Sequence, residues 1–114
     1  MANLIHAANK GHRRLEERSI LLHRAVAEKL RSNADVLEMA RERVESWCAD
    51  GSVHPHYAEA WQRLLAQSLD TIVEQIVDPG ETMRAMRQCT PFAGALDPRE
   101  RWAILRRARE HSAP

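Results

Sequence analysis

Apolar side chains recur every three or four residues through most of this 114-residue chain, and this period constrains the fold more than any other feature. The spacing is typical of amphipathic helices, because strands alternate apolar and polar residues instead. No alternating run rich in β-branched residues reaches strand length. The sequence therefore predicts an all-α protein, with residues 1–114 forming a single-domain, irregular bundle of four to six helices.

Short breaks divide the apolar pattern into helical segments. We expect helices over about 12–31, 34–49, 55–77, 79–88 and 98–110. Residues 55–77 could form one helix, or two with Ser68 capping the second, and the pattern fits both. The ends at 1–11 and 111–114 are expected to be flexible.

Two turns in the last third of the chain have almost the same sequence, Asp78–Glu81 and Asp97–Glu100. In each, the Asp can cap a helix, the Pro suits the first helical position, and the Glu can answer the cap. Between the turns lies an uncharged link, Thr90–Leu96. Both carboxylates are therefore interpreted as helix caps rather than catalytic acids.

The net charge of +1 conceals a segregation of charge along the chain. Residues 1–34 hold seven Lys and Arg against three Asp and Glu, residues 35–81 hold three against ten, and residues 82–114 hold seven against three. Two basic ends therefore flank an acidic middle. We favour pairing of the ends with the middle on folding, because soluble surfaces intersperse charge, and separate patches are the alternative.

The sequence contains no pattern typical of an active site or a metal centre. Cys48 lies six residues before His54, with His56 next to it, but a zinc site needs four ligands and no second pair is present. Neither Cys48 nor Cys89 lies in a motif with a recognisable base, and no glycine-rich phosphate loop occurs. We therefore expect no catalytic residue, no metal, no cofactor and no enzymatic activity.

The cellular compartment is inferred from the apolar segments and the cysteines. No stretch of about 18 apolar residues could span a membrane, and the first residues lack the apolar core of a signal peptide. We therefore expect a cytoplasmic protein without a membrane partner, in which Cys48 and Cys89 are reduced and buried as small apolar side chains.

An aromatic and basic cluster near the C-terminus indicates a binding surface, because Trp and Arg are enriched where proteins bind partners. Trp47 and Trp61 suit a core, whereas Trp102 lies between Arg101 and Arg106. The predicted partner-binding residues are Phe92, Arg99, Arg101, Trp102 and Arg106. The arginines would enter an acidic or phosphate-binding pocket, with Trp102 as an apolar anchor.

Nucleic-acid binding is the alternative, because clustered arginines neutralise phosphates. Its candidate residues are Arg13, Arg14, Arg18, Arg107 and Arg109. The protein would then be a small transcriptional regulator of its own operon, although the near-neutral charge argues against strong non-specific binding. A homodimer is a third possibility.

Most of the chain resembles small, mostly helical bacterial proteins of toxin–antitoxin loci. The resemblance lies in Glu59–Trp61, Leu69–Val73, Met86–Leu96 and Pro98–Trp102. Its most specific part is the run Pro91–Gly94 followed by Arg99–Arg101. The resemblance implies an antitoxin-like protein that neutralises a co-encoded toxin by direct binding, and many such proteins also bind their own promoter. The commonest antitoxins add a disordered arm, which this sequence lacks beyond its short ends.

Overall fold

The computed structural model describes the backbone of residues 2–112 and the side chains of residues 13–110. The described chain forms six helices and no strand, which confirms the all-α prediction. The helices are α1 (Ala2–Ser32), α2 (Ala34–Asp50), α3 (Pro55–Leu65), α4 (Leu69–Gln75), α5 (Glu81–Arg87) and α6 (Pro98–Ser112). None of the described helices is long and apolar enough to cross a membrane.

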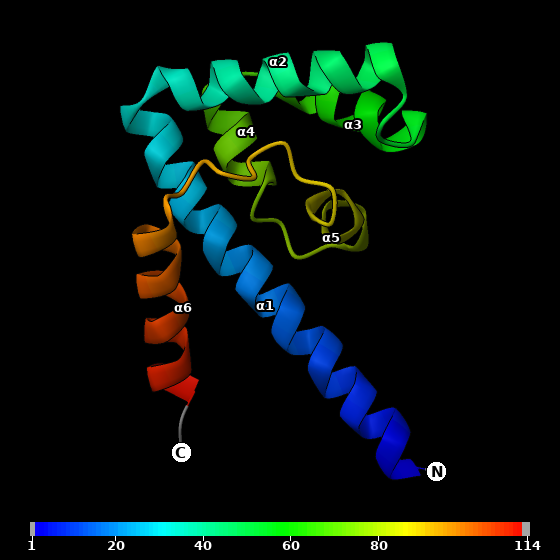
Figure 1. The fold of residues 1–114 in the computed structure, drawn as a ribbon, viewed down its shortest axis with the longest axis vertical. Coiled ribbons are helices and arrows are strands. Elements are labelled where there is room, and N and C mark those ends of the chain that lie inside the picture. Colours follow the sequence, from blue (N-terminus) through cyan, green and yellow to red (C-terminus); the bar gives the residue numbers. More distant parts are fainter. Residues whose placement is uncertain (1, 113–114) are drawn as a thin grey trace.

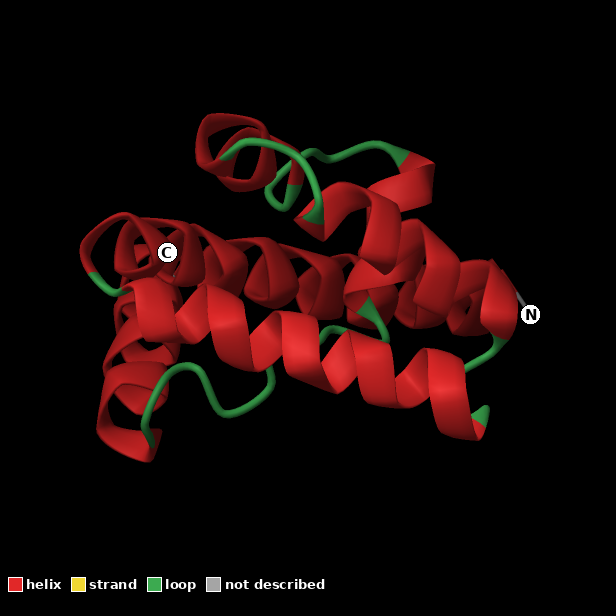
Figure 2. Cartoon of the chain, turned by 90° about the horizontal axis from the view of Figure 1, so that it is seen from above, coloured by secondary structure: helices red, strands yellow, loops and turns green. Residues whose placement is uncertain are grey.

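The longest helix, α1, contacts α2, α4 and α6, and the other helices lie around its C-terminal half (Figure 1). α2 crosses one end of α1, and α3, α4 and α5 lie on one side of it. α6 begins beside the C-terminal end of α1 and runs back along it, but the two helices diverge (Figure 1). Seen from above, the whole arrangement is helices joined by short loops (Figure 2).

Local capping explains most of the helix boundaries. Asn33 accepts the Asp35 N–H at the start of α2, and Gly51 ends that helix with a φ of 71°, a left-handed conformation that glycine adopts without a Cβ penalty. The Ser68 hydroxyl accepts the Thr71 N–H at 3.2 Å and opens α4. Residues 55–77 therefore contain two helices, α3 and α4, which confirms the alternative in which Ser68 caps the second helix.

The two Asp-Pro turns differ in the structure. At the second, Asp97 Oδ1 accepts the Glu100 N–H at 2.9 Å and Glu100 Oε1 accepts the Asp97 N–H at 3.1 Å, which confirms the predicted capping box. At the first, the prediction is wrong. Gly80 is the N-cap of α5, and Asp78 Oδ2 accepts the Gly80 N–H instead of capping the helix.

The beginning of α1 also departs from the sequence pattern. The helix starts at Ala2, so the backbone of residues 2–11 is helical rather than separate from the first helix. The predicted flexibility of the two ends is not tested, and Met1, Ala113 and Pro114 lie outside the described residues.

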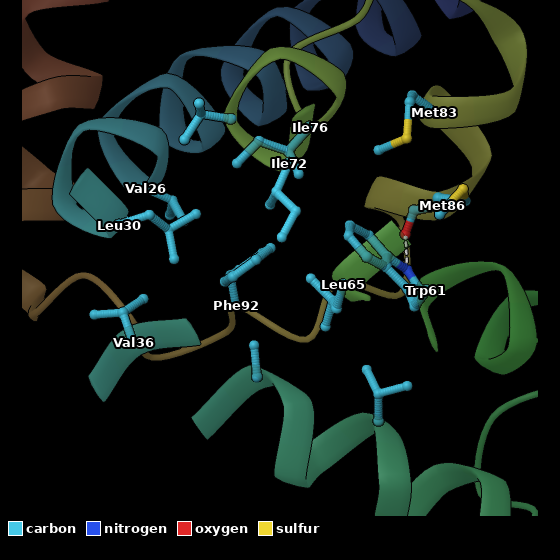
Figure 3. Close-up of a cluster of buried hydrophobic side chains, with 13 residues drawn as sticks. Val26, Leu30, Val36, Trp61, Leu65, Ile72, Ile76, Met83, Met86 and Phe92 are labelled. Carbon is cyan, nitrogen blue, oxygen red and sulfur yellow. Dashed lines mark hydrogen bonds between the residues drawn. The ribbon is translucent and has the colours of Figure 1, made fainter. Parts of the chain in front are cut away.

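One apolar core joins α1 to α5 and the link before α6. Its largest fully buried side chains are Trp61, Leu65, Ile72, Ile76 and Val44. Trp61 also donates its indole N–H to the Met86 carbonyl at 3.0 Å, which is the dashed line in Figure 3. Trp47 packs against this core while half-buried, so two of the three tryptophans behave as predicted. The expectation that both cysteines are buried is wrong for Cys48, which is exposed.

The link between α5 and α6 is held by polar contacts from several helices. Arg43 of α2 donates to the Pro91 carbonyl at 3.2 Å and to the Ala93 carbonyl at 2.7 Å. His23 of α1 lies 2.9 Å from the Thr90 hydroxyl. Because these contacts come from helices far apart in the sequence, they fix the point from which α6 starts.

Candidate partner-binding surface

α6 is attached to the outside of a core that is already complete. The core cluster contains no side chain from the described part of α6. The inner side of α6 carries half-buried residues, among them Ile104, Leu105 and Ala108, and Lys29 of α1 pairs with Glu100 at 2.7 Å. This leaves the opposite side of α6 open to solvent.

The exposed side of α6 carries a line of four residues that we call the outer strip. It consists of Arg99, Trp102, Arg106 and Arg109. Their spacing of three, four and three residues places them along one face of a helix, because each residue turns the helix by about 100°. Trp102 is 63% exposed, which is unusual for so large an apolar side chain.

Trp102 and Arg106 contact each other within the outer strip. The Arg106 guanidinium carbon lies 5.0 Å from the centroid of the Trp102 ring, within the range of a cation–π contact. Arg106 also pairs with Glu110 at 3.2 Å. The two contacts hold Arg106 over one side of the indole, so the strip presents an aromatic surface with fixed positive charge beside it.

The other two predicted partner-binding residues, Arg101 and Phe92, do not belong to the outer strip. Arg101 is exposed, but it lies a quarter of a turn or more around α6 from the outer strip. Phe92 is only 5% exposed and belongs to the core, where its ring meets Trp61 edge-on with centroids 5.9 Å apart. Phe92 therefore cannot contact a partner on this surface, and its role is to anchor the link before α6.

The predicted nucleic-acid-binding residues fall on two separate parts of the molecule. Arg13, Arg14 and Arg18 are exposed on the N-terminal half of α1, and Arg107 and Arg109 are exposed near the end of α6. These parts of α1 and α6 diverge in Figure 1. The fold does not gather the five arginines into one continuous patch.

The expected pairing of basic ends with the acidic middle is seen at Arg31 and Asp70, 2.9 Å apart. Other ion pairs join the two basic ends to each other, as Lys29–Glu100 and Arg84–Glu16 do. Arg99 and Arg101 form no ion pair with another described residue. Charge on the surface of α6 is therefore available to a partner.

The His and Cys side chains singled out by the sequence form no metal centre in the part of the chain that the structure describes. No group of three or more His, Cys, Asp or Glu side chains there could hold a metal ion. The His54 ring accepts the His56 N–H at 3.1 Å and so caps α3. Burial raises the pKa of the Cys89 thiol, which opposes formation of a nucleophilic thiolate.

Two buried polar side chains, His23 and Arg87, were not predicted from the sequence. Arg87 donates to the Ile76 and Asp78 carbonyls, at 3.2 and 2.7 Å. His23 Nδ1 lies 2.7 Å from the Ser19 carbonyl, which only accepts, so Nδ1 carries the proton. Burial, with a smaller contribution from the charge of Arg87, lowers the pKa of His23. A signal for His23 existed, because it shares a helical face with Val26 and Leu30.

Comparison of the sequence with protein-family models and with curated proteins gives no match, and comparison of the fold with solved structures gives none. The exposed side chains of this chain are therefore the evidence on its function.

Proposed function

We propose that this protein binds a partner protein through the outer strip of α6 and has no enzymatic activity of its own. The single observation that carries the proposal is the exposed Trp102, flanked by Arg99 and Arg106 on a helix that adds nothing to the core. Exposed Trp and Arg side chains on one face are typical of binding hot spots.

The partner that best suits this chain is a co-encoded toxin, which the protein would neutralise by occupying its surface. The toxin assignment derives from the resemblance of Met86–Leu96 and Pro98–Trp102 to antitoxin-like proteins. The surface chemistry supports it in one respect. Basic residues around an aromatic anchor suit an acidic surface with an apolar recess on the partner.

Co-expression with the product of the neighbouring gene tests this proposal. We expect the two proteins to co-purify and the chain to rescue growth that the neighbour inhibits. Trp102→Ala should abolish both effects. Leu15→Ala is the matched control, because Leu15 is 61% exposed but lies on α1. The proposal is contradicted if the unaltered chain neither co-purifies with the neighbour nor rescues growth. It is also contradicted if Trp102→Ala still does both.

A DNA-binding regulator is the second candidate, favoured by the exposed Arg13, Arg14 and Arg18 on the N-terminal half of α1. Phosphate contacts make binding strongly dependent on salt. A gel shift with the DNA upstream of the gene, at low and high salt, tests this candidate. Absence of a shift even at low salt removes it, and Arg14→Ala should weaken any shift that is seen.

A further inference from the structure

α2 carries an exposed strip whose spacing matches the outer strip of α6. Its core-facing residues are Val36, Ala40 and Val44. Its opposite side carries four exposed acidic residues, Asp35, Glu38, Glu42 and Glu45, which we call the acidic strip. Their spacing of three, four and three residues again places them along one helix face. Met39, which is 63% exposed, lies beside them.

The two strips are complementary in length, charge and apolar content. In each, the last residue lies ten positions after the first, which is about 15 Å along the helix. One carries four carboxylates and the other three guanidinium groups. Each also has one large exposed apolar side chain, Met39 or Trp102, and a thioether packs favourably against an aromatic ring.

The strips do not meet within one copy of the chain. α6 runs back along α1, whereas α2 crosses the end of α1 (Figure 1). Glu38 pairs with Arg41 and Arg106 pairs with Glu110, each within its own helix. Both strips therefore face outward and are accessible to another molecule.

We propose that the outer strip of α6 in one copy binds the acidic strip of α2 in a second copy. The inference does not rest on the proposed toxin partner, because it concerns the pure protein. The contact joins two different surfaces, so it is heterologous, and a pair of copies keeps one unused strip of each kind for further copies. A single pair of short helix faces is smaller than a stable interface, so the association is weak and reversible.

The contact would also regulate the partner-binding surface. A copy whose outer strip lies on α2 of its neighbour cannot use the same strip to bind a partner protein. Partner binding and self-association would then compete, and rising protein concentration would lower the apparent affinity for the partner.

Sedimentation velocity of the pure full-length chain tests the proposal. We expect the mass to rise with protein concentration at low salt and the rise to shrink at high salt, because the contact is mainly electrostatic. Glu42→Arg and Arg106→Glu should each weaken self-association at least about tenfold, since each places like charges against each other. Glu59→Arg, on the exposed side of α3, is the matched control and should behave as the unaltered chain.

A mixture of the two variants gives the sharpest result. Glu42→Arg keeps an intact α6, and Arg106→Glu keeps an intact α2, so one natural contact remains between them. At the other contact the two reversed charges meet with opposite sign, so the mixture should self-associate although each variant alone stays monomeric. A chain that is monomeric at every concentration and low salt overturns the proposal. Self-association that both variants retain also overturns it.

Discussion

Replacing two aromatic residues by alanine, Phe92 and Trp102, tests which of them belongs to the core and which to the surface. They lie ten residues apart in the sequence, and the sequence pattern assigns both to the same binding surface. In the structure one is 5% exposed and the other 63%. We therefore expect opposite consequences for Phe92→Ala and Trp102→Ala.

The cost of Phe92→Ala follows from the contacts of the ring. The side chain packs edge-on against Trp61 at 5.9 Å and against His23 at 6.4 Å between ring centroids. Removing a buried phenyl ring costs about 3–5 kcal/mol of unfolding free energy. For a chain of this size that loss lowers the urea midpoint by about 2 M. The variant should also free the link and thereby loosen α6.

Trp102→Ala should change the free energy of unfolding by less than about 1 kcal/mol. The ring stacks against the exposed Arg106 guanidinium, and such contacts are worth about 0.5–1 kcal/mol. Urea unfolding followed by far-UV circular dichroism measures both variants. If Phe92→Ala does not fold, the milder Phe92→Leu should still unfold cooperatively, at a urea midpoint below that of the unaltered chain. Equal midpoints for Phe92→Ala and Trp102→Ala would refute the assignment of one residue to the core and the other to the surface.

Three further predictions concern the elements that carry the surface. His23 has a lowered pKa, so the unfolded chain binds a proton before the folded one, and stability should fall as pH drops below about 6.5. Urea midpoints above and below that pH measure the loss, and His23→Gln should remove it. Asp97→Ala breaks a capping box and should lower the melting temperature more than Asp78→Ala, which removes no cap from α5. Equal shifts would contradict the difference between the turns. A chain ending at Leu96 should keep the circular dichroism and cooperative unfolding of α1 to α5, because α6 adds no side chain to the core. Loss of cooperative unfolding would contradict that account.

Features set by local chemistry were predictable from the sequence. The helical class follows from the apolar period, and the end of α2 follows from Gly51. The capping box at Asp97 and Glu100 follows from residues three apart in the chain. The same argument fails at Asp78 because Gly80 takes the N-cap position and the Asp side chain bonds the Gly80 N–H instead.

Features that depend on which elements meet could not be predicted in the same way. Phe92 lies in an uncharged link near arginines, and nothing local indicates that His23 and Trp61 lie beside it. The buried Arg87 depends on carbonyls at Ile76 and Asp78 that only the fold brings within reach. Trp102 was correctly separated from the two core tryptophans, because its neighbours on α6 are arginines.

The affinity of the chain for the product of the neighbouring gene tests the central claim, that the outer strip of α6 is a partner-binding surface. Titration calorimetry with purified proteins measures it for the unaltered chain, Trp102→Ala and Leu15→Ala. We predict that Trp102→Ala raises the dissociation constant at least about thirtyfold, as removal of a hot spot of about 2 kcal/mol does, while Leu15→Ala leaves it within about twofold. Equal affinities for the unaltered chain and Trp102→Ala would contradict the claim.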